Sequence, residues 1–266
     1  MVRISDSEFG QFQRFIFETA GITLGDAKKA LVSGRLAKRL HACKVNSYGD
    51  YFRLLMSGNA VELQIAVDLL TTNETYFFRE PKHFRFLKEQ ITSGAFGTSS
   101  VRVWSAAGST GEEAYSIAML LEDLLTGQPW EVVASDISTR VLERARAGHY
   151  AMDRSDHFPS GYLQRFCLKG CDEQAGTLLV QRSLRSKVRF LQVNLNAPLP
   201  HLGMFHVIFL RNVLIYFNNE TKRKVVARAL NLLKPGGYLF IGHSESLIDV
   251  SEAVELVAPA IYYKAP

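Results

Sequence analysis

From residue 101 to residue 243 the sequence alternates between short strand-like runs and longer helix-like stretches. Runs rich in β-branched and aromatic residues predict strands at 101–108, 131–136, 188–194, 204–212 and 236–243. Helical spacing of apolar residues predicts helices at 112–125, 138–148 and 222–233. In the second of these helices, Ser138 is the expected N-cap and Gly148 the expected C-cap. Alternation of strands with helices predicts an α/β fold built on a parallel sheet.

Two regions depart from this alternation. Residues 1–70 repeat apolar residues at helical spacing and show no strand pattern, which predicts a small all-helical N-terminal domain. Residues 71–266 then form the α/β domain. Within it, residues 150–187 break the rhythm with a Gly-flanked polar loop, which predicts an inserted subdomain made of a helix and a small hairpin.

The composition restricts the class of protein. A chain of 266 residues with 47% hydrophobic and 21% charged residues is typical of a folded globular protein. The net charge of +5 is compatible with an anionic partner, but no base-stacking or base-reading motif accompanies it, so no nucleic acid is expected. Cys43, Cys167 and Cys171 lack zinc-ligand spacing, so no metal is expected. No apolar run approaches the roughly 18–20 residues that span a bilayer, and we expect a cytoplasmic monomer without membrane insertion.

The carboxyl ends of the predicted strands are where an open α/β sheet binds its ligand. Gly108 and Gly111 follow the first strand and allow a ligand to approach the backbone closely. Asp136 ends the second strand, where an acid suits hydrogen bonds to ribose hydroxyls. The later strand ends carry Asn194, Leu195, Arg211 and Asn212.

The first helix of the alternating region discriminates between two classes of cofactor. The GxGxxG pattern that cradles a nicotinamide pyrophosphate is absent, and the helix opens with Glu112 and Glu113. Two carboxylates there repel a pyrophosphate but tolerate a cationic sulfonium or an α-amino group. This favours S-adenosylmethionine over a nicotinamide cofactor.

Five motifs carry a resemblance that covers almost the whole chain: TTNETYFFRE (71–80), VWSAAGSTGEEAYSIA (103–118), ASDIS with VLERARAG (134–148), VIFLRNVLIYF (207–217) and LLKPGGYLFIGHSES (232–246). They resemble the CheR family, the bacterial chemotaxis receptor methyltransferases. The resemblance implies a Rossmann-like S-adenosylmethionine-dependent methyltransferase domain with a small all-helical N-terminal domain and a small β-subdomain insertion. It implies methyl transfer to glutamate side chains on the cytoplasmic helical signalling domain of chemoreceptors, for sensory adaptation. The products would be glutamate methyl esters and S-adenosylhomocysteine.

The resemblance also assigns residues. It implies cofactor contacts at Asn73, Thr75, Arg79, Glu113, Asp136, Asn194, Leu195, Arg211 and Asn212. It places Arg79 and Tyr216 next to the transferred methyl group, as catalytic residues. Some relatives use the inserted subdomain to hold a C-terminal receptor peptide, but the insertion here matches the family less well, so that partner is left open.

The chemistry of the acceptor suggests roles for the two catalytic candidates. A glutamate with an ordinary pKa of about 4.3 is already a nucleophile at neutral pH, so no general base is required. Burial raises the pKa of such a carboxyl unless a cation opposes the shift. We therefore expect Arg79 to keep the acceptor ionised and oriented, with Tyr216 helping to orient it; plain aromatic packing is the alternative for Tyr216. Phe77 and Phe78 are expected to anchor the segment that carries Arg79.

A basic face is predicted in the N-terminal domain. On a helical wheel, Lys28, Arg35, Lys38 and Arg39 fall on one arc beside an apolar arc. One interpretation is a solvated face, and the other is a docking surface for the glutamate-rich receptor helix.

Two other functions compete with methyl transfer. GHSES (242–246) approaches the G-x-S-x-G elbow of hydrolases but lacks its final glycine, and the adjacency of His243 and Ser244 makes no triad. A non-catalytic scaffold on a methyltransferase fold would be expected to have an eroded site, whereas the cofactor motifs here keep their key residues.

Overall fold

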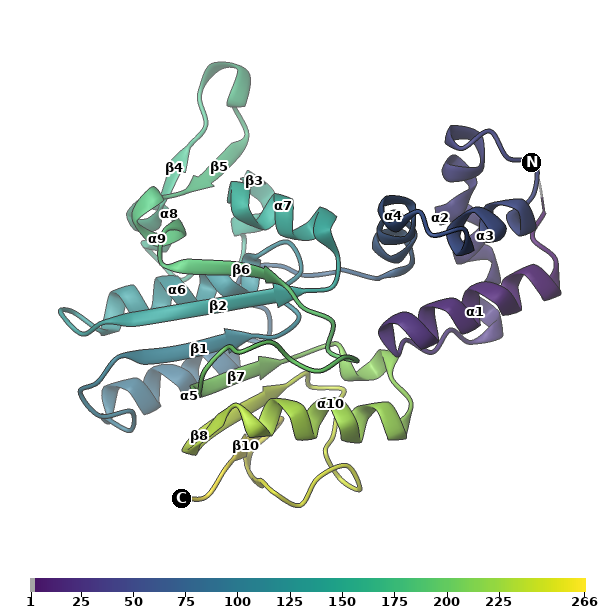
Figure 1. Ribbon diagram of the computed structural model, residues 1–266. Helices are drawn as coiled ribbons and strands as arrows, with labels where there is room; N and C mark the ends of the chain where they lie inside the picture. The colour runs from purple at the N-terminus through teal and green to yellow at the C-terminus, as the bar shows by residue number, and fades with distance from the viewer. Residues whose placement is uncertain (1–2) are drawn as a thin grey trace.

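The computed structural model describes residues 3–266, and its largest unit is one seven-stranded sheet (Figure 1). The strand order is β6 (Val188–Gln192), β2 (Trp130–Asp136), β1 (Val101–Ser105), β7 (Phe205–Leu210), β8 (Leu233–Ile241), β10 (Ile261–Tyr263) and β9 (Glu255–Ala258). Strands β6, β2, β1, β7 and β8 run parallel to one another, whereas β10 is antiparallel to both β8 and β9. The predicted Rossmann-like α/β class is confirmed. The expectation of a parallel sheet is wrong at one edge, because the last part of the chain folds back as an antiparallel pair.

Helices cover both faces of the sheet. Helices α5 (Pro81–Thr92) and α6 (Glu112–Leu124) share one apolar core with the sheet, and α10 (Asn219–Asn231) belongs to the core on the other face (Figure 1). Helix α7 (Thr139–Ala147) packs against β6 and β2. Strand β7 lies at the centre and is buried at every position, which explains why its sequence is apolar apart from His206 and does not alternate.

The N-terminal region is helical and has its own core. It consists of α1 (Asp6–Ala20), the 3₁₀ turn η1 (Asp26–Lys28), α2 (Lys29–Ala42), α3 (Tyr48–Met56) and α4 (Ala60–Leu70). Phe12, Leu36 and Tyr51 are fully buried where these helices meet. Across residues 3–266, every helix is too short or too polar to cross a membrane.

The insertion forms a small separate sheet. Its strand order is β3 (His149–Ala151), β5 (Thr177–Val180) and β4 (Cys167–Lys169), all antiparallel. Short helices α8 (Tyr162–Phe166) and α9 (Arg182–Arg185) and the 3₁₀ turns η2 (Met152–Ser155) and η3 (Asp172–Gln174) complete it. The β-subdomain therefore exists as expected. Strand β3, which pairs with β5, is an addition to the helix and hairpin that the sequence predicted.

Several contacts join the helical region to the α/β region, and three groups of them involve Asn194, Ile22 and Asp68. The Asn194 amide donates to the Thr19 carbonyl at 2.6 Å, and an isolated bridge pairs Ile22 with Phe217. The third contact involves Asp68 near the end of α4. Its carboxylate accepts the Thr139 backbone N–H at 3.0 Å and the Thr139 hydroxyl at 2.9 Å, at the first turn of α7.

Asp68 thus replaces the expected side-chain cap of α7. Ser138 occupies the N-cap position, but its side chain caps no backbone N–H, and its buried hydroxyl has no partner among residues 3–266. The Arg140 N–H also points at the Asp68 carboxylate, at 3.4 Å. Gly148 is the C-cap as predicted, with a φ of 62°. A cap from a distant helix fixes the α4–α7 orientation as well as the helix end.

This arrangement yields a stability prediction with a built-in control. Asp68→Ala should lower the free energy of unfolding by about 1–2 kcal/mol, since it leaves the first N–H groups of α7 uncapped in a partly buried seam. Ser138→Ala should change it by less than about 0.5 kcal/mol, because the Ser138 hydroxyl caps nothing. Urea unfolding of both variants measures the difference. Equal losses would show that Asp68 is not the cap that matters.

Candidate functional site

A cavity opens at the carboxyl ends of the parallel strands, between the sheet and the helical region. Every expected cofactor contact lines it: Asn73, Thr75, Arg79, Glu113, Asp136, Asn194, Leu195, Arg211 and Asn212. Tyr216 lines it as well. The helical region contributes part of the wall through Ile22, Thr23, Leu24, Lys28 and Leu31. The cavity therefore lies between the two regions and is walled by both.

The loop after β1 forms one wall. Ser109 has a φ of 49° and directs its backbone N–H to Asp136 Oδ2 at 3.0 Å, while its hydroxyl donates to the Asn73 carbonyl at 2.8 Å. Gly111 has a φ of 97°, and a Cβ there would lie 2.9 Å from the Ala145 Cβ. Burial raises the pKa of Asp136 to about 6, against the opposing hydrogen bonds from the Ser138 and Ser109 N–H groups. This acid is therefore held in place by the backbone at the end of β2.

Arg211, at the end of β7, joins several parts of the site. Its side chain is 1% exposed, and its guanidinium contacts Glu113 Oε2 at 2.9 Å and Glu80 Oε2 at 3.1 Å. It also donates to the Arg79 carbonyl. Burial opposes the charge of Glu80, but Arg211 and the Asn212 amide hold its pKa below the usual value. Burial raises the pKa of Glu113 despite Arg211 and the Ser105 hydroxyl. One guanidinium is thus shared by two largely buried carboxylates.

The segment 71–80 forms a wall of the cavity. Phe77 and Phe78 are buried, and the Phe78 N–H donates to the Ser116 hydroxyl of α6 at 2.9 Å. Phe77 also packs edge-on against Tyr150 of the inserted subdomain, with ring centroids 5.0 Å apart. These contacts leave Arg79 partly exposed at the cavity, where its guanidinium donates to the Glu74 carbonyl at 2.8 Å.

Tyr216 comes from the 3₁₀ turn η4 (Leu214–Tyr216), which follows β7. Its carbonyl accepts the Thr23 N–H at 2.8 Å, so the helical region fixes its backbone. Burial raises the pKa of Tyr216, and the positive charge of Arg79 opposes the rise. Both expected catalytic side chains, Arg79 and Tyr216, line the same cavity.

The four basic residues expected to dock a partner are not equivalent. Arg39 binds Glu62 through two hydrogen bonds, of 2.9 and 2.5 Å, and Arg35 donates to the Thr71 carbonyl at 2.9 Å. Both guanidiniums are therefore committed to contacts within the chain. Lys28 and Lys38 are exposed, and only Lys28 reaches the cavity. The helical wheel placed the four on one arc but did not show which side chains fold back.

Two carboxylates of this region were not among the expected site residues. Glu80 pairs with Arg211, and Glu245 accepts the backbone N–H groups of Asn212 at 2.9 Å and Gly242 at 2.6 Å. Glu245 thereby holds the loop after β7 against the end of β8. Glu245 comes from the GHSES run, so at least this residue of the run has an architectural role. Glu80 in TTNETYFFRE and Glu245 in GHSES were visible in the sequence, but their partners were not. Arg211 lies more than a hundred residues from Glu80, and Asn212 lies about thirty residues from Glu245.

Comparison with known proteins places these features in a family. A model described as "CheR methyltransferase, all-alpha domain" matches residues 7–71, and one described as "CheR methyltransferase, SAM binding domain" matches residues 73–262. The chain is 40% identical over 267 residues to the chemotaxis protein methyltransferase of Salmonella typhimurium, covering 97% of this chain and 90% of that protein. It is 40% identical over 265 residues to the Escherichia coli protein of the same name, covering 97% and 91%. Chemotaxis protein methyltransferase 2 of Pseudomonas aeruginosa is 39% identical over 261 residues, covering 97% and 93%.

Proposed function

This chain belongs to the CheR methyltransferase family, a family of S-adenosylmethionine-dependent enzymes of chemotaxis, and we propose that it methylates glutamate side chains of chemoreceptors. The product would be a glutamate methyl ester. One observation carries the proposal beyond the family. The cavity at the strand ends is lined by the cation of Arg79 and the phenol of Tyr216 as well as by the acids Glu113 and Asp136.

The residues of the cavity fit S-adenosylmethionine by their chemistry. Two carboxylates, Glu113 and Asp136, line a cavity whose ligand carries a sulfonium and an α-amino group. Asp136 is buried, so hydroxyl donors from a ribose would compensate its loss of solvent. Ile137, Val193 and Leu195 supply an apolar wall suited to a purine. When bound, the cofactor supplies an electrophilic methyl group on a cationic sulfur.

Arg79 and Tyr216 would act on the acceptor. An incoming glutamate loses water at the cavity, which raises its pKa, and the Arg79 guanidinium opposes that rise. Arg79 would therefore keep the nucleophile ionised and direct one carboxylate oxygen into the cavity. Tyr216 would provide a hydroxyl that orients the same carboxylate. Positioning of this kind can contribute roughly 7–11 kcal/mol to lowering a barrier.

The experiment is methyl transfer from labelled S-adenosylmethionine to a panel of chemoreceptor signalling domains. The expected result is label in the receptor that mild base releases, because carboxyl methyl esters hydrolyse in base whereas methylated amines do not. Receptor domains with the target glutamates replaced by alanine are the control. Base-stable label, or label retained by the alanine receptors, would contradict glutamate as the acceptor.

We further propose that the exposed lysines Lys28 and Lys38, not Arg35 and Arg39, attract the acidic receptor helix. Lys28 lies at the cavity, and Arg35 and Arg39 are occupied within the chain. Surface charges of this kind act mainly on association rates and lose their effect in salt.

The double variant Lys28→Glu/Lys38→Glu should lower kcat/KM for receptor about three- to tenfold at low salt, with kcat nearly unchanged, because steering affects encounter and not the chemical step. The deficit should shrink as ionic strength rises. Lys222→Glu/Lys224→Glu, at a partly exposed and an exposed position of α10, is the matched control. An equal deficit in the control, or a deficit independent of salt, would rule out docking at Lys28 and Lys38.

A further inference from the structure

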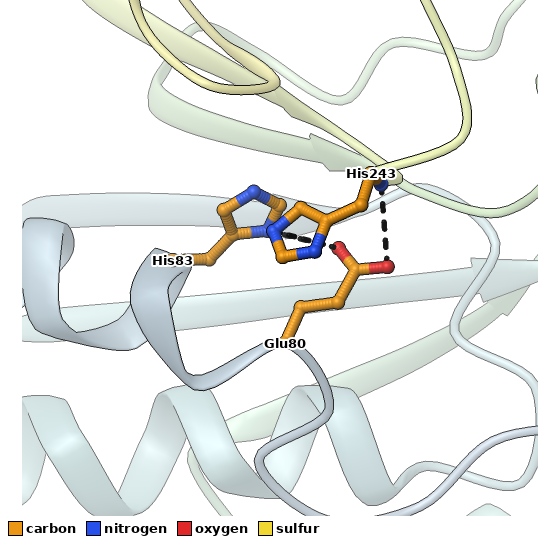
Figure 2. A group of neighbouring side chains, drawn as sticks. All are labelled: Glu80, His83 and His243. Carbon is orange, nitrogen blue, oxygen red and sulfur yellow. Dashed lines mark hydrogen bonds and ion pairs between the residues drawn. The ribbon is translucent and has the colours of Figure 1, made fainter.

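Three side chains that can ligate a metal meet beside the cofactor cavity (Figure 2). Glu80 is the N-cap residue of α5, His83 lies in the first turn of that helix, and His243 follows β8. One ligand atom from each lies within 4.8 Å of the others. His83 Nδ1 is 3.3 Å from Glu80 Oε2, and His243 Nε2 is 3.9 Å from the same oxygen. Figure 2 shows both imidazole rings next to the Glu80 carboxylate.

His83 supplies an independent observation. Its side chain is completely buried, and neither ring nitrogen has a hydrogen-bond partner in the part of the chain that the structure describes. The Pro259 carbonyl influences the ring, but no hydrogen bond of normal geometry forms. A buried polar group without a partner costs about 1–3 kcal/mol. An unpartnered buried imidazole beside a carboxylate and a second imidazole is the arrangement expected of side chains that bind a metal ion.

The local charge also favours a cation. Glu80 and Glu113 share the single guanidinium of Arg211, so the cluster carries one more formal negative charge than positive. Imidazole ligands are neutral and add no charge. A dication bound by Glu80 would therefore find a carboxylate in excess, although it would compete with Arg211 for Oε2.

The ligand types select the metal. Two imidazoles and one carboxylate suit Zn²⁺ and neighbouring transition metals, whereas Mg²⁺ and Ca²⁺ prefer oxygen ligands alone. We propose that Glu80, His83 and His243 bind a transition-metal dication, with Zn²⁺ the best match, at the rear of the methyltransferase site. The metal ion would reach the site from solvent on the side of His243, whose side chain is 43% exposed. Because Glu80 would turn from Arg211 toward the metal, occupancy would loosen the contact of Arg211 with the Arg79 backbone.

The test is a zinc titration of the full chain against a chromogenic chelator. Cys171→Ser should be present in every sample, because that exposed thiol could bind zinc by itself. We expect one zinc per chain, and a loss of affinity of about tenfold or more in His243→Ala, since it removes one of three ligands. Because His243 is partly exposed, this variant should fold. His201→Ala, at an exposed histidine away from the cluster, should leave affinity unchanged.

A second readout uses Co²⁺ as the probe. Cobalt held by two imidazoles and a carboxylate gives visible absorption that depends on the ligands, and we expect this spectrum in the parent and in His201→Ala but not in His243→Ala. Zinc affinity that is equal in the parent and in His243→Ala would overturn the proposal. So would equal losses in His243→Ala and His201→Ala, because the binding would then be a surface effect of histidines in general.

Discussion

Arg79→Ala is expected to lower the rate of methyl transfer by about 100- to 1000-fold, the usual cost of removing one electrostatic group that acts on the reacting atoms. Arg79 lies partly exposed at the cavity that Tyr216 also lines, and its guanidinium donates to the Glu74 carbonyl. Without its charge the acceptor glutamate enters a poorly solvated site with no counter-ion. Single-turnover transfer to a receptor domain measures the effect, with cofactor affinity measured in parallel by calorimetry.

The pH profile separates this role from a merely structural one. Loss of the cation should raise the pKa of the bound acceptor, so the variant should recover part of its activity as pH increases, whereas the parent should stay level. Arg79→Lys should fall between the two, because a lysine keeps the charge but not the planar fork. Arg85→Ala removes an exposed arginine of α5 and is the matched control. Turnover of Arg79→Ala near that of the parent would remove Arg79 from the catalytic assignment.

Arg211→Ala should destabilise the fold by about 3–5 kcal/mol at pH 8, because it leaves the buried carboxylates of Glu80 and Glu113 without their shared counter-ion. The penalty should depend on pH with a definite sign. In the variant, both folded-state pKa values lie above those of the unfolded chain, so the ionised acids destabilise the fold at high pH. As pH falls toward 5 the acids take up protons and the difference from the parent shrinks.

Urea unfolding at pH 8 and pH 5 tests both statements. Lys224→Ala is the control, because Lys224 pairs with Glu220 on the exposed surface at 2.6 Å, and such pairs contribute less than about 0.5 kcal/mol. A loss below about 1 kcal/mol in Arg211→Ala would show that water or other donors already satisfy the two acids. A penalty that grows as pH falls would contradict the assigned direction of the pKa changes.

The sequence was informative wherever the physical signal is local. A mostly apolar run predicts strand β7, and the position of Gly148 after a helical pattern predicts the C-cap. The cavity residues at strand ends could be expected because parallel strands bring their carboxyl ends to one edge: Asp136, Asn194, Leu195, Arg211 and Asn212. The other expected residues of the cavity came from the family resemblance: Asn73, Thr75, Arg79 and Tyr216. Their use as cofactor contacts or catalytic residues remains a prediction that follows from the family.

Contacts between residues that are far apart in the chain could not be predicted from the sequence in this way. The Asp68 cap on Thr139 joins residues 71 positions apart, and nothing in either neighbourhood indicates the other. Strand β9 was missed because its residues are mostly exposed, so it lacks an alternation between buried and exposed positions. The helical wheel showed Arg39 as part of a basic arc, but Glu62, its partner, lies on another helix.

The contacts between α4 and α7 bear on how receptor preference can diversify. Pseudomonas aeruginosa has relatives designated chemotaxis protein methyltransferase 1 and 2, which shows that one organism can contain several such enzymes. If the helical region docks the receptor, as proposed above, exchange of helical regions between paralogues would be a simple route to new receptor preference. Here, however, the exchanged piece would carry Asp68 and leave Thr139 behind, and it would bring its own cavity wall at Lys28 and Leu31. Recombination at residue 71 would therefore have to preserve the Asp68–Thr139 contact and the shared cavity wall. The helical and α/β regions would then have to be inherited together.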